Sequence, residues 1–250
     1  MKSHAIDERR QLLVPGDKEA TLAYATQHWV ECAKEAIQKR GAFFVALSGG
    51  STPKEIFRRL ASEHQESLDW SRVFLFWSDE RSVPPTDSDS NFHMAMVAAG
   101  LEKLPLDPSH IFRMEGENEV QESANRYSLL IQNTVSEGIF DLIMLGMGDD
   151  AHTASLFPHT QALHEKEKWV VANHVPQKET WRITFTYPLI NRARCIVLYV
   201  LGAGKAAPLA AVLQPKANFE ELPSFNVGTP QNRATWLCDS AASASLGTDA

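Results

Sequence analysis

The feature that most constrains the fold is an alternation between short apolar runs and longer amphipathic segments. Four runs are almost entirely apolar and bounded by polar or glycine-rich turns, as buried strands are: Ala42–Leu47, Val73–Trp77, Phe140–Leu145 and Cys195–Leu201. The segments around them have a helical pattern: Asp17–Arg40, Pro53–Ser62, Val120–Val135 and Ala203–Leu213. Strands that are apolar on both faces and alternate with helices are typical of parallel sheets. The sequence therefore predicts an α/β fold with a mainly parallel sheet and helices on both faces.

Weaker patterns predict the remaining elements. These are a helix over Phe92–Leu101, a short strand over Ile111–Met114, a strand from about Trp181 to Phe185, and a last strand over Ala234–Cys238. The segment Asp79–Asn91 is polar, carries two prolines and is expected to be a loop. No internal repeat is present, and we expect one domain over residues 1–250 with frayed ends.

Composition excludes several classes of protein. The formal net charge of −7 argues against a nucleic-acid partner, which usually requires a dense cationic face. Residues 1–10 lack the apolar core of a secretory signal, and no apolar run is long enough to span a membrane. Cys32, Cys195 and Cys238 are too few and too scattered in sequence to indicate a disulfide framework or a zinc site. We therefore expect a cytoplasmic protein with no membrane or nucleic-acid partner.

Ligands of parallel α/β folds bind beyond the carboxyl ends of the strands, and two polar motifs follow the first two apolar runs. Gly49, Gly50, Ser51 and Thr52 lead from a strand into a helix, where free N–H groups and the helix dipole favour an anion. A phosphate cradle and an ordinary capped turn explain this motif equally well. Next come Asp79 and Glu80, candidates for polar catalysis, and Arg81, a candidate for binding an acid or phosphate; alone, this motif would suggest a surface ion pair.

Two further motifs follow later strands. Asp150 and His152 lie just after the glycine-rich turn 146–148, and an aspartate that orients a histidine is suited to general-base catalysis. Arg182 and Lys205 could supply the local positive charge that an acidic protein needs to bind a phosphorylated sugar. Each of these two cations alone would be expected at a solvated surface, but together with residues 49–52 they favour phosphate binding.

In this order, the motifs resemble the 6-phosphogluconolactonase family, within the fold group that includes glucosamine-6-phosphate deaminase and ribose-5-phosphate isomerase. The resemblance rests on Leu47–Pro53, Trp77–Pro84 with Asn91, Leu145–Pro158, Arg182–Thr184 and Gly202–Ala206, with a weaker match at Leu222–Pro223 and Trp236–Asp239. It extends from the first helix to Asp239. It implies hydrolysis of 6-phosphogluconolactone to 6-phosphogluconate in the oxidative pentose phosphate pathway.

The resemblance also implies roles for individual residues. The turn Gly49–Thr52, Arg182 and Lys205 would hold the phosphate, with Asp79 and Arg81 among the substrate-binding residues. His152 would act on the water that attacks the lactone carbonyl, with Asp150 beside it. We expect no metal and no cofactor, because no ligand set has metal-binding spacing and Gly146-x-Gly148 is only part of a dinucleotide fingerprint. The expected partner is a small phosphorylated lactone.

One departure from the family leaves alternatives open. The family turn usually reads Asp-Gly-His, whereas here Ala151 occupies the middle position, where a positive φ would strain an alanine. A non-catalytic sugar-phosphate-binding regulator is therefore one alternative. An aminosugar deaminase is the other, although that family has a proton-transferring glutamate where this chain has Phe157.

Overall fold

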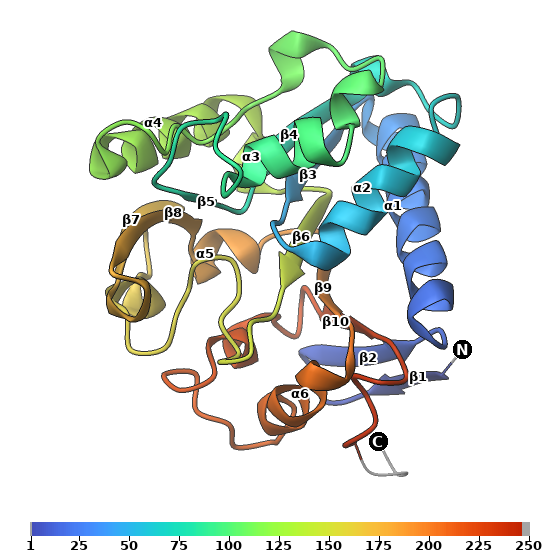
Figure 1. Ribbon diagram of the computed structural model, residues 1–250, viewed down its shortest axis with the longest axis vertical. Coiled ribbons are helices and arrows are strands. Elements are labelled where there is room, and N and C mark those ends of the chain that lie inside the picture. The colour runs from blue at the N-terminus through green and yellow to red at the C-terminus, as the bar shows by residue number, and fades with distance from the viewer. Residues whose placement is uncertain (1, 247–250) are drawn as a thin grey trace.

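The computed structural model describes residues 2–246, which form two sheets flanked by helices (Figure 1). The larger sheet has seven strands in the order β1 (Lys2–Ala5), β2 (Arg10–Val14), β10 (Ala234–Cys238), β9 (Ile196–Val200), β6 (Leu142–Gly146), β3 (Phe43–Leu47) and β4 (Val73–Trp77). All neighbouring strands pair in parallel except β1, which is antiparallel to β2. The prediction of a mainly parallel α/β sheet is confirmed.

Six α-helices are described, some continued by short 3₁₀ or π turns: α1 (Lys18–Arg40), α2 (Ser51–Glu63), α3 (Asn91–His93), α4 (Val120–Thr134), α5 (Tyr187–Ile190) and α6 (Ala206–Val212). Asp17 caps α1 by accepting a hydrogen bond from the Ala20 N–H at 2.9 Å. Among the described residues no helix is long and apolar enough to cross a membrane.

Alternation along the strands creates a hydrophobic core on each face of the large sheet. Val45 and Leu75 point into one core with Trp29 of α1 and the apolar side of α2. Ala46 and Phe76 point into the other, which α4 and α6 help to enclose. Figure 1 accordingly shows α1 and α2 on one side of the sheet and α4 on the other.

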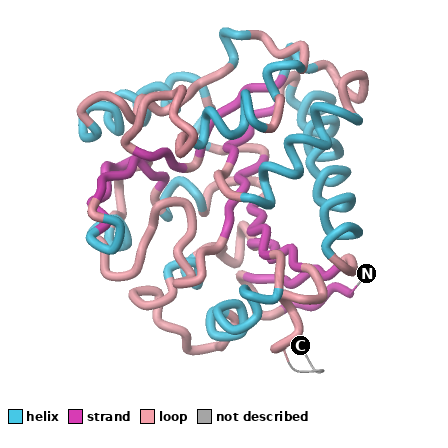
Figure 2. Tube along the Cα trace, in the orientation of Figure 1, coloured by secondary structure: helices cyan, strands magenta, loops and turns pink. Residues whose placement is uncertain are grey.

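A second sheet was not predicted. It is antiparallel, with the order β5 (Asp79–Arg81), β8 (Thr180–Phe185) and β7 (Val170–Val175), and Figure 2 shows it beside the large sheet. The prediction that residues 79–91 form only a loop is wrong for its first three residues. They were missed because Asp-Glu-Arg has no strand-like composition, whereas pairing with β8 gives their backbone hydrogen-bond partners.

Several boundaries also differ from the predictions. Helix α2 begins at Ser51, two positions before Pro53, which a first turn accommodates because its N–H groups lack helical partners. The predicted helix over 92–101 is divided into α3, a π turn and a 3₁₀ turn, and the predicted strand over 111–114 makes only one bridge, between Ile111 and Leu75.

The chain ends are more ordered than expected over the described residues. Residues 2–5 form β1, and the segment 240–246 folds back onto the protein, with the Ser240 N–H donating to Gly16 at 2.7 Å. The expectation of frayed ends otherwise concerns residues 1 and 247–250, which lie outside the described residues.

Candidate active site

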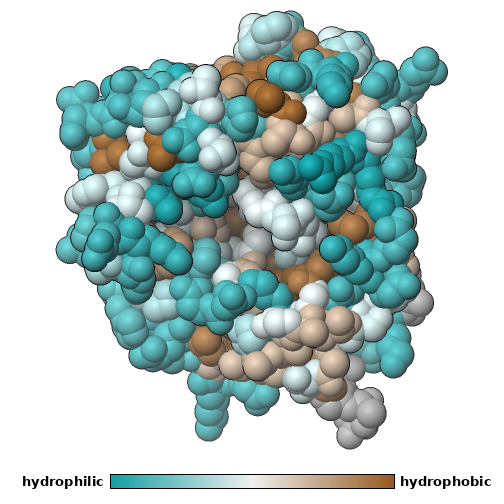
Figure 3. Space-filling model, viewed as in Figure 1, coloured by the Kyte–Doolittle hydropathy of each residue, from teal (hydrophilic) through white to brown (hydrophobic). Residues whose placement is uncertain are grey.

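A pocket of about 300 Å³ opens at the carboxyl ends of the central parallel strands, where Figure 3 shows a hollow in the surface. Its size is that of a small-molecule site. Nine of the ten predicted site residues line it: Gly49, Gly50, Ser51, Thr52, Asp79, Arg81, His152, Arg182 and Lys205. The tenth, Asp150, lies behind His152 and contacts it directly. The fold thus brings together residues from five separate parts of the chain.

The turn before α2 forms one end of this pocket. Gly50 has a φ of 105°, and no side chain caps the first turn of α2 among the described residues. The first N–H groups of this 13-residue helix are therefore available to an anion. Gly49 packs so tightly that a Cβ there would lie 1.9 Å from Oδ1 of Asn91. This close packing fixes the turn against the segment that carries Asp79.

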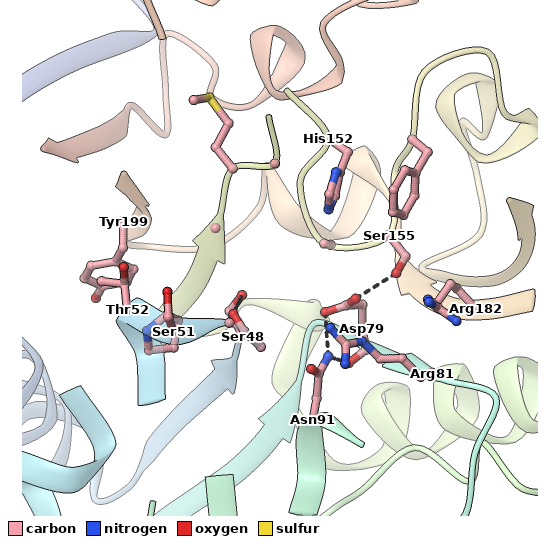
Figure 4. A pocket seen from close by; sticks show the side chains of 18 of the residues that line it. Ser48, Ser51, Thr52, Asp79, Arg81, Asn91, His152, Ser155, Arg182 and Tyr199 are labelled. Carbon is pink, nitrogen blue, oxygen red and sulfur yellow. Dashed lines mark hydrogen bonds between the residues drawn. The ribbon is translucent and has the colours of Figure 1, made fainter. Parts of the chain in front are cut away.

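Asp79 is a buried organising residue of the pocket. Its carboxylate is 6% exposed and accepts hydrogen bonds from Ser155 Oγ at 2.7 Å and Asn91 Nδ2 at 3.1 Å (Figure 4). It therefore connects β5, the start of α3 and the segment after His152. Because both carboxylate oxygens already have partners, Asp79 positions the pocket wall as well as contributing negative charge.

Glu80 does not line the pocket, so the idea that it takes part in catalysis is not supported by its position. Its carboxylate is 2% exposed and accepts hydrogen bonds from the N–H groups of Arg81, Asn91 and Phe92 and from Ser90 Oγ, at 2.7–2.9 Å. It holds the loop 81–90 closed and fixes the start of α3.

Arg81 and Arg182 are direct cross-strand partners on β5 and β8. Within the described part of the chain neither guanidinium forms an ion pair with a carboxylate; Arg81 donates to the Asp89 carbonyl and Arg182 to the Trp181 carbonyl. Burial and the charge of Arg81 lower the pKa of Arg182. Two like charges facing each other across a ladder are unfavourable, and a bound anion would relieve that repulsion.

Lys205 is the third cation and already has a partner. Its Nζ lies 2.6 Å from Asp149 Oδ1, and this pairing lowers the pKa of Asp149. The carboxylate is 86% exposed and the lysine side chain 26%. Asp149 can therefore turn into solvent when another anion approaches Lys205.

Figure 4 separates these groups within the pocket. Ser51 and Thr52 lie on one side with Tyr199, whereas Arg81 and Arg182 lie on the other side with Asp79 and Ser155. Arg182 thus lies across the pocket from the turn with which the sequence grouped it, and its contact with the phosphate stays a prediction. Both ends suit negative charge.

His152 is held in one orientation by three contacts. Its Nδ1 lies 2.5 Å from Asp150 Oδ1, its backbone N–H donates to the same oxygen at 3.1 Å, and its ring stacks on Phe157 with centroids 3.9 Å apart. Burial raises the pKa of Asp150, but the hydrogen bond and charge of His152 outweigh it, so this pKa lies below its ordinary value. An ionised Asp150 accepts a hydrogen bond from the Nδ1–H, which leaves Nε2 with a free electron pair.

Gly148 makes this arrangement possible. A Cβ at residue 148 would lie 2.1 Å from His152 Nδ1 and 2.5 Å from Asp150 Oδ1. Any other residue would displace the imidazole or the carboxylate. The Gly148 N–H also donates to the His152 carbonyl at 2.9 Å, which closes the turn.

Ala151 adopts the conformation that the sequence analysis treated as a source of strain. Its φ is 59°, its side chain is fully buried, and its carbonyl accepts a hydrogen bond from the Ser224 N–H at 3.0 Å. The turn therefore keeps the backbone shape suited to glycine. The position of His152 is not lost, because the contacts on either side of Ala151 hold the turn.

We expect Ala151→Gly to change the free energy of unfolding by less than about 1 kcal/mol and to keep or raise catalytic activity. Glycine relieves roughly 1–2 kcal/mol of steric strain. It also enlarges the unfolded ensemble, at about 0.4–1 kcal/mol, and removes a buried methyl group worth about 0.8 kcal/mol. Urea unfolding and steady-state kinetics measure both effects. A variant that is much less stable and also slower would show that alanine is the better fitted residue.

Sequence reasoning missed Tyr199 and Lys178 as pocket residues. Tyr199 lies in β9, and its buried hydroxyl has no hydrogen-bond partner among the described residues. Its place near the carboxyl end of a predicted strand could have signalled it. Lys178 lies in the connection between β7 and β8, which carries no recognisable motif.

Comparison with known proteins gives this pocket a context. Residues 16–236 match the family described as glucosamine-6-phosphate isomerases/6-phosphogluconolactonase. The chain belongs to this family. It is 40% identical over 236 residues to a 6-phosphogluconolactonase of Chlamydia muridarum, and this alignment covers 94% of this chain and 90% of that protein. It is 46% identical over 205 residues to a 6-phosphogluconolactonase of Treponema pallidum, and that alignment covers 78% of this chain and 81% of the other protein.

A solved structure agrees with these relatives. The 6-phosphogluconolactonase of Trypanosoma brucei superposes with a TM-score of 0.79 at 25% identity, covering 94% of this chain and 98% of that one. The family resemblance and fold predicted from sequence are therefore confirmed. The family description includes isomerases, whereas these three relatives are named as lactonases.

Proposed function

We propose that this chain is a 6-phosphogluconolactonase, which hydrolyses 6-phospho-D-glucono-1,5-lactone to 6-phospho-D-gluconate in the oxidative pentose phosphate pathway. The observation that carries the mechanism is the oriented His152–Asp150 pair, which faces a pocket with an anion-binding feature at each end. The named relatives support the same reaction. We place the reaction in the cytoplasm, as the sequence predicts.

The substrate is proposed to lie across the pocket. Its phosphate would bind at the turn Gly49–Thr52 with Lys205, because the helix N–H groups and this cation both line the pocket. The lactone ring would then extend toward His152, with Arg81 and Arg182 beside the carbonyl group. This orientation places a fixed positive field where negative charge develops on the carbonyl oxygen.

The reaction needs one residue to move protons. Nε2 of His152 takes a proton from water as the water oxygen attacks C1, while Asp150 stabilises the resulting imidazolium. The carbonyl π electrons move to oxygen and form a tetrahedral oxyanion beside the two arginines. As the carbonyl re-forms, the bond between C1 and the ring oxygen breaks, and the imidazolium returns its proton to that leaving oxygen. The net reaction adds one water to one lactone.

Phe157 argues against the deaminase alternative. Its side chain stacks on the imidazole and carries no group that could transfer a proton.

The test of the proposed function is hydrolysis of freshly generated 6-phosphogluconolactone, corrected with an enzyme-free blank because the lactone also hydrolyses spontaneously. Ammonia release from glucosamine 6-phosphate is measured in parallel. Ammonia release without accelerated hydrolysis would overturn the proposal, and product binding without catalysis would favour a regulator.

Lys205→Ala and Arg182→Ala are expected to separate the two ends of the pocket. Loss of a charge-assisted contact costs about 1.5–3 kcal/mol, so kcat/KM for the phosphorylated lactone should fall roughly ten- to hundredfold in each variant. Lys205→Ala should leave hydrolysis of unphosphorylated gluconolactone nearly unchanged, whereas Arg182→Ala should impair both substrates. Lys166→Ala, at an exposed position, is the control. Equal effects of Lys205→Ala on both substrates would refute its assignment to the phosphate.

A further inference from the structure

A cluster of three side chains with metal-binding chemistry lies outside the pocket. His28 and Cys32 are one turn apart on α1, and Cys195 immediately precedes β9. One ligand atom from each lies within 4.8 Å of the others. Cys32 and Cys195 are far apart in sequence, but the fold brings them together. Cys238 is buried in the opposite core and takes no part.

The spacing of the atoms is close to that of a tetrahedral site. Cys32 Sγ lies 3.7 Å from His28 Nε2. Zinc bonds of about 2.3 Å to sulfur and about 2.0–2.1 Å to nitrogen, at a tetrahedral angle, place those two ligand atoms about 3.6 Å apart. Two sulfurs bound in the same way lie about 3.8 Å apart. Because Cys32 Sγ also lies 3.9 Å from His28 Nδ1, the imidazole must rotate to direct the lone pair of one nitrogen at the ion, whereas the ligand atoms are already close enough to surround it.

The surroundings favour a cation that binds thiolates. All three side chains are partly exposed, so an ion can reach them. Two thiols and one imidazole form a donor set that suits Zn²⁺. The charge of Glu31 interacts with His28, and the charge of Glu35 interacts with Cys195. These two glutamates add negative charge around the cluster.

We propose that His28, Cys32 and Cys195 bind one Zn²⁺ ion, with the fourth position open to water. Both thiols bind as thiolates and the imidazole binds as a neutral donor. Binding one ion to the fully protonated thiols therefore releases two protons. The ion would join the middle of α1 to the start of β9, at the amino end of a strand whose carboxyl end faces the pocket. Its role would be to stabilise the fold, and the hydrolysis proposed above does not depend on it.

The test is a titration of the fully reduced, metal-free protein with Co²⁺ under anaerobic conditions. We expect one ion per chain, a thiolate-to-cobalt charge-transfer absorption and its loss when Zn²⁺ is added. A hundredfold excess of Zn²⁺ over its Kd should raise the Tm by roughly 5–10 °C. Cys32→Ser and Cys195→Ser should each strongly reduce the affinity for Co²⁺ and weaken the charge-transfer absorption. His28→Ala should reduce the affinity for Co²⁺ but keep the charge-transfer absorption.

Two variants serve as controls. Cys238→Ala removes the cysteine outside the cluster, and His152→Ala removes a histidine of the pocket; both should bind Co²⁺ as the unmodified protein does. A reduced protein without the charge-transfer absorption would overturn the proposal, as would an absorption that survives in the Cys32→Ser/Cys195→Ser double variant. Lactonase activity is not the readout, so failure of the metal site would leave the proposed function untouched.

Discussion

Replacing His152 with alanine is expected to slow lactone hydrolysis by about 10²–10⁴-fold, the usual effect of removing a general base. The reason is geometric. Nδ1 is held 2.5 Å from Asp150 and the ring is stacked on Phe157, so the remaining nitrogen is the group oriented to act on water. Binding of the product 6-phosphogluconate should change little, because the proposed phosphate contacts lie on the turn before α2 and on Lys205. Single-turnover kinetics and calorimetric titration with product measure the two quantities.

His164→Ala is the matched control for this variant. His164 is 60% exposed and pairs with Glu220, so its removal should alter neither rate nor affinity. His152→Asn adds a second comparison, since asparagine keeps some polar contact but cannot accept a proton from water. Hydrolysis near the unmodified rate in both His152 variants, after subtraction of the blank, would show that another group activates the water.

Glu80→Ala is expected to lower the free energy of unfolding by roughly 3–5 kcal/mol, because each buried donor left without its acceptor costs about 1–3 kcal/mol. Truncation leaves the N–H groups of Arg81, Asn91 and Phe92 without their acceptor in a buried region. Urea denaturation measures the loss. Because Asn91 also donates to Asp79, the surviving folded protein should show a raised KM.

Two comparisons make the result for Glu80 specific. Glu66→Ala removes an exposed glutamate and should change stability by no more than about 0.5 kcal/mol. Glu80→Gln keeps an oxygen acceptor in place and should fall between the alanine variant and the unmodified protein. An alanine variant as stable as the Glu66 control would mean that water replaces the carboxylate at no cost.

The large sheet could be predicted because burial on both faces leaves a direct record in the sequence. Val73–Trp77 and Ala234–Cys238 were bounded correctly on that basis. The second sheet left no such record: β5 is made of charged residues, and its strand conformation depends on pairing with β8, about 100 positions away in sequence. Pairing between distant segments is a property of the folded chain, which local periodicity does not carry.

The same distinction applies to the candidate site. Motifs at strand ends pointed to the pocket residues, since parallel strands bring their carboxyl ends to one edge. Their partners could not be inferred in that way. Ser155 contacts Asp79 across 76 positions, and Arg182 is the cross-strand partner of Arg81 on the ladder of β5 and β8. The proximity of Cys32 and Cys195 is another contact of this kind.

The ion pair between Lys205 and Asp149 makes phosphate binding at that end an exchange of partners. An incoming group must attract the ammonium more strongly than a carboxylate already 2.6 Å away, which a dianion can do and a neutral sugar hydroxyl cannot. Water hydrates the Asp149 carboxylate once it is released from Lys205, because its side chain is 86% exposed. The net affinity is a difference between two attractions that dissolved salt weakens together. Substrate binding at Lys205 should therefore depend less on ionic strength than binding to an unpaired lysine would.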